Sequence, residues 1–261
     1  MITKTWTPGR VILHLLVGLV AGLLSGLFGV GGGVLIVPAL VLLLGYGQRL
    51  AAGTSLAAIV PTATVGALSY GVTGNVAWIA ALILAGGAVI GAQGGTWLLP
   101  RVPVRALQFA FVAFLAVVIV GLFLAVPARG EPFETTVVTG IGLAVVGLAT
   151  GVLSGLLGVG GGIVVVPALM LLFGASDLIA RGTSLMMMIP AAISGTIGNM
   201  RRLNVNLIGA GLIGLAACTT TALGVWLART IDPFVGSVVF AVFLTAVGVQ
   251  LTVRAIRSPR S

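Results

Sequence analysis

Long apolar segments recur along nearly the whole chain, and polar residues gather in the short stretches between them. A helix of about 20 residues crosses a hydrocarbon core of about 30 Å, and most of these segments reach that length. In each half the second segment has only 11 residues, which is short for a full crossing. The pattern predicts an all-α integral membrane protein with about 8–10 membrane segments. The expected segments are Val11–Phe28, Val34–Leu44, Ala51–Tyr70, Val76–Leu99, Val104–Val126, Val137–Leu157, Ile163–Phe173, Gly182–Asn199, Val205–Ala228 and Pro233–Val253.

Two stretches of the chain are near-copies of each other. Ser25–Leu40 reads SGLFGVGGGVLIVPAL, and Ser154–Leu169 reads SGLLGVGGGIVVVPAL. We call the difference in residue number between Ser25 and Ser154 the repeat offset. The same offset relates the GTSL motif at Gly53–Leu56 to the one at Gly182–Leu185. A constant offset through both halves indicates that one unit was duplicated to build the chain. We therefore expect a first transmembrane repeat at 1–126, a linker at 127–136 and a second transmembrane repeat at 137–261.

The charged residues between the segments distinguish two topologies. If each glycine run belongs to one broken span, the thirteen basic residues divide eight to five between the two sides of the membrane. If the run is instead a turn that returns the chain to its starting side, they divide ten to three, and all four acidic residues lie on the other side. The positive-inside rule favours the turn, with both termini cytoplasmic. The halves are then inverted repeats, each a glycine-broken helical hairpin followed by three transmembrane helices, and such repeats are typical of transporters.

Composition excludes several classes of protein. Hydrophobic residues make up 59% of the chain and charged residues 7%, whereas soluble domains carry about 25% charged residues. The net charge of +9 is spread singly or in pairs, without the clustered basic and aromatic residues of a nucleic-acid surface, so we expect no nucleic-acid partner. His14 and Cys218 have no further ligands at metal-binding spacing. We expect His14 to be packed or interfacial and Cys218 to be a small core residue.

The glycine runs at Gly29–Gly33 and Gly158–Gly162 interrupt apolar sequence where a helix would otherwise continue. Glycine permits positive φ and close approach of the backbone, so several N–H groups can converge on one point. A helix that starts after each run would direct its positive end at the same point, and Ser25 and Ser154 would each add a hydroxyl. Such a cradle would bind an oxyanion without a full positive charge. Inverted symmetry would bring both runs to the bilayer midplane.

Helix packing is the alternative explanation for the glycines. Three consecutive glycines cost a helix about 1 kcal/mol each, so for them we favour a functional break. We also expect the helix after each run to begin at Pro38 or Pro167, with extended residues before it, because proline is tolerated in a first helical turn. For six glycines spaced four residues apart we expect close packing of helices. These six are Gly18, Gly22, Gly26, Gly147, Gly151 and Gly155.

The GTSL motifs are expected to open the helix that follows each hairpin. Their Thr and Ser hydroxyls either cap that helix or reach the site formed by the glycine runs, and both roles are compatible. The second copy carries Arg181 where the first has Ala52. Arg181 would either line an outer vestibule and guide anions, or act as an interfacial topology signal.

Catalytic and coupling groups are missing from the apolar segments. No Asp, Glu or Lys falls within them, so the usual intramembrane proton carriers are absent. A Walker motif, paired carboxylates, a metal cluster or a Ser/His/Asp set cannot be assembled from the sequence. We therefore expect no enzyme, no cofactor and no metal site. A membrane potential that is negative inside would drive export of an anion without a coupled ion.

The doubled motifs, with AAGTSL and ARGTSL after them, resemble those of the sulfite exporter TauE/SafE family, also called the 4-toluenesulfonate uptake permease family. The resemblance extends over Val11–Val253. It implies a multi-pass permease of the bacterial inner membrane, associated with sulfite, sulfonates and related organosulfur anions. These implications agree with the oxyanion cradle expected from the glycine runs.

We therefore expect a secondary transporter that exports small sulfur-containing anions, driven by the membrane potential or by a proton or sodium gradient. An anion channel, a non-transporting membrane scaffold and a carrier for a cation held by backbone carbonyls are the alternatives. The oligomeric state is open, with a homodimer as one alternative. The expected substrate-binding residues are Ser25, Gly31, Gly32, Gly33, Thr54, Ser55, Ser154, Gly160, Gly161, Gly162, Thr183 and Ser184.

Overall fold

The structure is a computed structural model that describes residues 7–99, 112, 116, 119–120 and 137–257. The described residues are helical apart from short connections, and no strand occurs among them. The segment expected at 104–126 and the linker at 127–136 lie almost wholly outside these ranges. The helices are α1 (Pro8–Phe28), α2 (Gly33–Leu42), α3 (Gln48–Gly71), α4 (Trp78–Leu98), α6 (Val137–Leu157), α7 (Gly162–Phe173), α8 (Asp177–Met200), α9 (Leu207–Thr230) and α10 (Pro233–Arg257).

Six of these helices, α1, α3, α4, α6, α8 and α9, are long and apolar enough to cross a membrane. Their outward faces carry large apolar side chains, such as Ile12 at 56% and Leu82 at 65% exposure. In water such a surface would be unfavourable, whereas in a bilayer it meets lipid. The prediction of an all-α integral membrane protein is confirmed.

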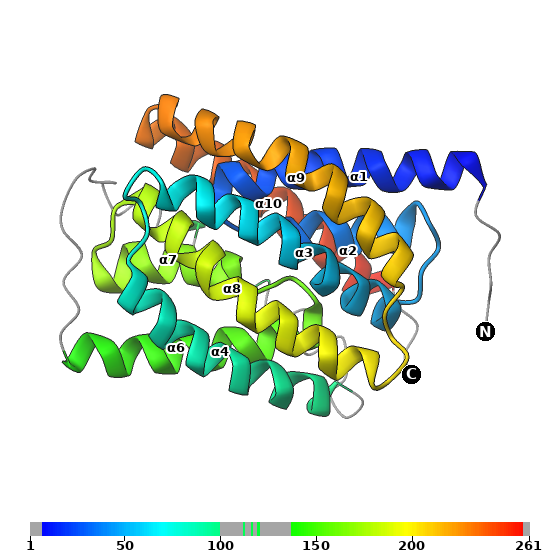
Figure 1. Ribbon diagram of the computed structural model, residues 1–261, viewed down its shortest axis with the longest axis horizontal. Helices are drawn as coiled ribbons and strands as arrows, with labels where there is room; N and C mark the ends of the chain where they lie inside the picture. Colours follow the sequence, from blue (N-terminus) through cyan, green and yellow to red (C-terminus); the bar gives the residue numbers. More distant parts are fainter. Residues whose placement is uncertain (1–6, 100–111, 113–115, 117–118, 121–136, 258–261) are drawn as a thin grey trace.

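Matching helices of the two halves run in opposite directions (Figure 1). The helix α1 starts at the right beside the N-terminus, and α2 turns back to that end, whereas α6 starts at the left and α7 turns back to the left. In the same way α3 runs from right to left and α8 from left to right. Each glycine run is therefore a turn that returns the chain towards the end from which it came.

Helix pairs join the two halves, with α1 along α9, α4 along α6 and α3 against α8. The six glycines at four-residue spacing form the contacts of the first two pairs. Gly22 faces the carbonyl of Ala217, and Gly151, its counterpart in the second half, faces that of Ala88, so closely that any Cβ would collide. Helix packing through these six glycines is confirmed. They are Gly18, Gly22, Gly26, Gly147, Gly151 and Gly155.

His14 belongs to a hydrogen-bonded cluster that ties together loops at the end of the molecule where α1 begins. It is 1% exposed, so the prediction that it is packed is confirmed. Its Nδ1 donates to the Arg10 carbonyl at 2.6 Å, which leaves Nε2 to accept from the Tyr46 hydroxyl at 3.1 Å. Tyr46 in turn accepts from the Asn206 amide at 2.9 Å. Burial raises the pKa of the Tyr46 phenol, so it stays protonated and able to donate.

Four expected helix starts are wrong. The short helices begin at Gly33 and Gly162, so Pro38 and Pro167 lie inside them and the residues before them are helical. The reason is local, because the carbonyl of Gly32 already accepts from the N–H groups of Leu35 and Ile36 and so closes the first turn.

The other two errors concern α3 and α8, which begin at Gln48 and Asp177. The GTSL motifs therefore lie in the second helical turn and do not cap their own helices. In α8 the capping residue is Ser176, which accepts from the N–H of Ile179. Asp177 is the first residue of α8 and is 1% exposed, so an acidic residue does lie in a buried helix.

Candidate functional site

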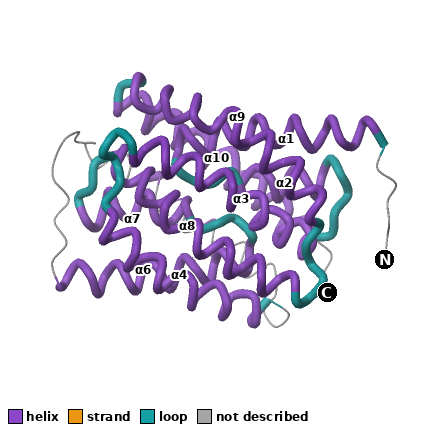
Figure 2. Tube along the Cα trace, in the orientation of Figure 1, coloured by secondary structure: helices purple, strands orange, loops and turns teal. Residues whose placement is uncertain are grey.

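The two glycine breaks have the same unusual backbone. Gly29, Gly31 and Gly32 have φ of 70°, 69° and 74°, a left-handed conformation that costs little only for glycine. Gly158, Gly160 and Gly161 repeat it with φ of 72°, 83° and 83°. The positive φ values end α1 and α6 and turn the chain into α2 and α7. Loops are accordingly seen inside the helical bundle as well as at its two ends (Figure 2).

The two breaks touch each other. A Cβ on Gly33 would lie 2.8 Å from the carbonyl oxygen of Val159, and one on Gly162 would lie 2.7 Å from Cα of Val30. These contacts are reciprocal, since the repeat offset relates Gly33 to Gly162 and Val30 to Val159. The fold thus brings the glycine runs of the two halves to a single place, which we call the glycine crossing and define as residues 29–34 and 158–163.

Two apolar side chains cover the glycine crossing. The terminal methyl of Met188 from α8 meets both Gly31 and Gly160, and Ile59 from α3 meets Gly31, Gly33 and Gly160. Ile59 and Met188 are themselves related by the repeat offset. The residues of the crossing are buried, except that Val159 is half-buried. Backbone groups at the crossing are therefore shielded from bulk water and lipid.

Backbone donors at the crossing outnumber its free acceptors. The N–H groups of residues 30–34 and 159–163 have no acceptor among the described residues. Several carbonyls are used, because Gly29 O accepts from Ser184 and Gly32 O and Gly161 O each accept two N–H groups. Buried N–H groups without partners are rare in folded proteins. The carbonyls of Val30, Gly31, Gly158, Val159 and Gly160 accept no hydrogen bond among the described residues, but the free N–H groups outnumber them. This surplus of donors favours an anion rather than a cation as ligand.

The seryl residues expected at the site divide into two kinds. The hydroxyls of Ser25, Ser55 and Ser154 are at most 1% exposed and have no hydrogen-bond partner among the described residues. Ser184, by contrast, donates to the Gly29 carbonyl at 2.9 Å. Ser25 and Ser154 lie one turn after Ala21 and Thr150, the residues nearest to Gly32 and Gly161. This helical spacing places their hydroxyls on the face of α1 and α6 that approaches the crossing.

The threonines of the GTSL motifs bond elsewhere. Thr54 Oγ accepts from the N–H of Asn206 at 3.0 Å, and Thr183 Oγ accepts from the N–H of Ala77 at 2.9 Å. Each threonine thereby holds the residue before a helix of the other half. These bonds give the two threonines a structural role at the junction between the halves.

Three residues near the crossing were not expected from the sequence. Ile59 and Met188 looked like ordinary packing residues, although the repeat offset pairs them and each lies four residues after a GTSL serine. Arg181 is 4% exposed, so it is neither a vestibule residue nor an interfacial signal. Its guanidinium donates to the Leu27 carbonyl at 2.9 Å inside the protein.

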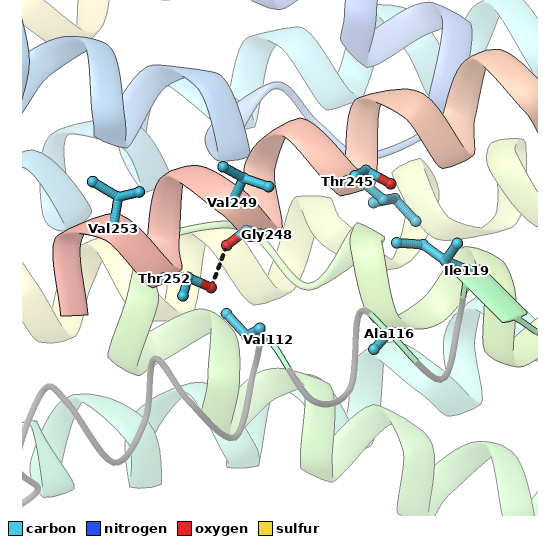
Figure 3. A pocket seen from close by; sticks show the side chains of 9 residues that line it. Val112, Ala116, Ile119, Thr245, Gly248, Val249, Thr252 and Val253 are labelled. Atoms are coloured by element: carbon cyan, nitrogen blue, oxygen red, sulfur yellow. Dashed lines mark hydrogen bonds between the residues drawn. The ribbon is translucent and has the colours of Figure 1, made fainter. Parts of the chain in front are cut away.

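An apolar cavity of about 290 Å³ lies apart from the glycine crossing, between α10 and Val112, Ala116 and Ile119 (Figure 3). Its two hydroxyls, of Thr245 and Thr252, donate to carbonyls of their own helix, at Ala241 and Gly248. The described residues that line the cavity therefore offer an anion no free hydroxyl, and we place the candidate site at the crossing.

The chain is similar to known membrane transporters. The sequence profile of the family described as "Sulfite exporter TauE/SafE" matches residues 143–261. "Probable membrane transporter protein YunE" of Bacillus subtilis is 27% identical over 95% of this chain and 99% of its own length. "Probable membrane transporter protein YdhB" of the same organism is 30% identical over 72% of this chain and 78% of its own length. No solved structure matches the chain.

These similarities extend over most of the chain and agree with its apolar helices, which make it a multi-pass membrane protein. The chain belongs to the sulfite exporter TauE/SafE family of membrane transporters.

Proposed function

We propose that the protein is a secondary transporter of small sulfur-containing anions, such as sulfite or organosulfonates, and that it binds them at the glycine crossing. The observation that carries the proposal is the surplus of buried donors there. The N–H groups of residues 30–34 and 159–163 and the hydroxyls of Ser25, Ser55 and Ser154 have no acceptor among the described residues. The oxygens of a sulfite or sulfonate group would supply those acceptors.

The opposite directions of the two halves support alternating access to this site. Inverted repeats whose broken helices meet near the midplane can open to either side by rocking of one repeat against the other. We place the protein in the bacterial inner membrane with both termini in the cytoplasm. There the membrane potential drives export of an anion by about 2.3 kcal/mol per charge at 100 mV, without a coupled ion.

An anion channel, a scaffold and a cation carrier are the competing functions. The occupied carbonyls of Gly29, Gly32 and Gly161 count against a cation carrier. The close contact of Ile59 and Met188 with the glycines counts against an open channel, because it leaves no continuous aqueous path at that point. A scaffold would have no use for buried donors without partners, which cost free energy.

Flux of labelled sulfite in proteoliposomes tests the proposal, with the membrane potential clamped and the proton and sodium gradients varied separately. We expect flux that saturates with sulfite concentration and follows the potential. Dependence on one ion gradient would identify that ion as the coupling ion. Flux that rises without saturation would indicate a channel. Absence of flux for sulfite and for a panel of sulfonates would refute the proposal.

A further inference from the structure

A buried ion pair lies within α8 at one end of the glycine crossing. Arg181 Nη2 is 3.5 Å from Asp177 Oδ2, and the two side chains are 4% and 1% exposed. Charges buried in a membrane protein are costly, and they commonly mark a substrate or ion pathway. The charges occur in one half only, because the equivalent residues of the first half are the uncharged Gln48 and Ala52. The fold shared by the two halves therefore does not require them.

The pair is continuous with the candidate site along one face of α8. Arg181 packs its backbone against Gly29, Ser184 donates to the Gly29 carbonyl at 2.9 Å, and Met188 covers Gly31. These residues are three and four positions apart, which is the spacing of one helix face. The first half has the same arrangement without the charge, since Gly158 packs against Ala52 of α3. One end of the site therefore carries a buried charged pair, and the other does not.

The guanidinium is held by contacts that an anion could replace. Its Nη1 donates to the Leu27 carbonyl at 2.9 Å. The separation of 3.5 Å from Asp177 exceeds the roughly 2.7–2.9 Å of a tight charge-assisted hydrogen bond. A guanidinium has five N–H donors in a planar fork, which fits two oxygens of one oxyanion.

Resting on the function proposed above, we propose that Arg181 is the countercharge of the transported anion and that Asp177 holds Arg181 while no substrate is bound. Two oxygens of a sulfite or sulfonate group would take the place of the Asp177 carboxylate on the guanidinium. The N–H cradle alone carries no full charge, so Arg181 would be the one full positive charge in direct contact with the anion inside the membrane. Asp177 then acts as an internal competitor of the substrate.

A purely structural role of the pair predicts different behaviour. In that case the pair only fastens α8 to the end of α1, and replacing both charges by a neutral pair of similar shape would preserve function. Buried ion pairs can often be replaced in this way without loss of stability. The double variant Asp177→Asn with Arg181→Gln therefore separates the two roles, even if Arg181→Gln alone fails to fold.

The experiment measures sulfite flux in proteoliposomes and the sulfite-induced shift of the unfolding temperature in detergent. Arg181→Gln, Asp177→Asn, the double variant and the wild type are compared, with Arg229→Gln, an exposed arginine at the same end of the molecule, as the control. We expect KM for sulfite to rise at least tenfold in Arg181→Gln and in the double variant, and to be unchanged in the control. Sulfite should stabilise Asp177→Asn more than the wild type, because it replaces the missing carboxylate.

A double variant with the KM of the wild type would overturn the inference and leave the proposed function intact. The same holds if sulfite raises the unfolding temperature of Arg181→Gln as much as that of the wild type. A folded wild-type protein that carries neither sulfite nor a sulfonate would refute the proposed function itself, and with it this inference.

Discussion

At the scale of single residues, a buried hydroxyl without a hydrogen-bond partner indicates a role in ligand binding, because it does not stabilise the empty protein. Ser25 Oγ is fully buried and has no partner among the described residues, whereas Ser184 Oγ donates to Gly29 O. An unsatisfied buried polar group costs about 1–3 kcal/mol, and a hydrogen bond to a charged group contributes about 1.5–3 kcal/mol. Ser25 thus reduces the stability of the empty protein and would regain the cost when an anion binds.

We expect Ser25→Ala to leave the unfolding temperature unchanged or raised, and to raise KM for sulfite about ten- to hundredfold. Ser154→Ala should behave alike, because its hydroxyl is 1% exposed and equally without a partner among the described residues. Ser184→Ala is the matched control. It should lower stability by about 1 kcal/mol, since it leaves a buried carbonyl without its donor. Thermal unfolding and flux kinetics of the three variants check this, and a less stable Ser25→Ala with unchanged KM would contradict it.

Some residues near the site could be predicted from the sequence, and others could not. The duplicated motif indicated Ser25 and Ser154, because a hydroxyl just before a glycine break recurs in both halves. It could not show that Thr54 bonds to Asn206 of the other half, because that contact depends on how the halves pack. Arg181 was misjudged for the same reason. A lone arginine beside an apolar segment is usually interfacial, and only the fold places it against Leu27 and Asp177.

At the scale of elements, the glycine breaks require backbone that other residues adopt only at a cost. Gly161 has φ of 83°, and a Cβ there would meet nothing closer than 3.3 Å, so strain is the main effect of Gly161→Ala. Gly74, in the loop before α4, has φ of 72° and open space around it. An alanine at either position costs about 1–2 kcal/mol through the left-handed conformation. Gly161→Ala and Gly74→Ala therefore introduce the same backbone strain, one at the glycine crossing and the other in a loop away from it.

We expect both variants to lose similar stability, and only Gly161→Ala to lose sulfite flux, by tenfold or more, because the strain shifts N–H groups at the crossing. Gly32→Ala adds a steric conflict, since its Cβ would lie 2.8 Å from the Ala21 carbonyl oxygen, and should lose more. Gly32→Leu and Gly161→Leu should abolish flux while the protein still inserts into the membrane. Flux and thermal unfolding are measured together for each variant. Equal loss of flux in Gly74→Ala and Gly161→Ala would show that global stability, not the crossing, limits transport.

Element boundaries show where sequence patterns reach their limit. The long apolar segments predicted the membrane helices to within a few residues. For Val137–Leu157 the predicted and observed bounds are the same. The starts of α2, α3, α7 and α8 were placed too late. Proline suggested a start at Pro38, but the left-handed Gly32 caps a helix that begins at Gly33, five residues earlier. Asp177 looked like a loop residue because it is charged, although an acidic residue suits the first turn of a helix.

At the scale of the whole molecule, the duplication accounts for the pairing of helices. The contacts of Gly22 with Ala217 and of Gly151 with Ala88 are the same contact made twice between the halves, because the repeat offset relates both partners. The hydrogen bonds of Thr54 and Thr183 across the halves form a second such pair. The sequence revealed the repeat offset but not which helices meet, because that follows from folding of both halves together. Each half thus completes its packing with the other.

The structure also defines which loops share an end of the molecule, and this makes the topology testable. Arg10 donates to the Leu44 carbonyl and Tyr46 bonds to Asn206, so the start of α1 and the loops at 43–47 and 201–206 lie together. That end carries Arg10, Arg49, Arg201 and Arg202, whereas Arg229 and Asp232 lie at the far end of α9. The positive-inside rule assigns the arginine-rich end to the cytoplasm.

Cysteine labelling checks this assignment in a Cys218→Ser background, which removes the single native cysteine. Gly47 has open space around it, and Val72 is 88% exposed at the opposite end, so both positions tolerate a cysteine. A membrane-impermeant maleimide added to intact cells should label Val72→Cys and leave Gly47→Cys unlabelled until the membrane is permeabilised. The reverse pattern would place both termini outside. It would also put the Arg181 end of the glycine crossing on the cytoplasmic side, where Arg181 would meet anions before export rather than after passage through the crossing.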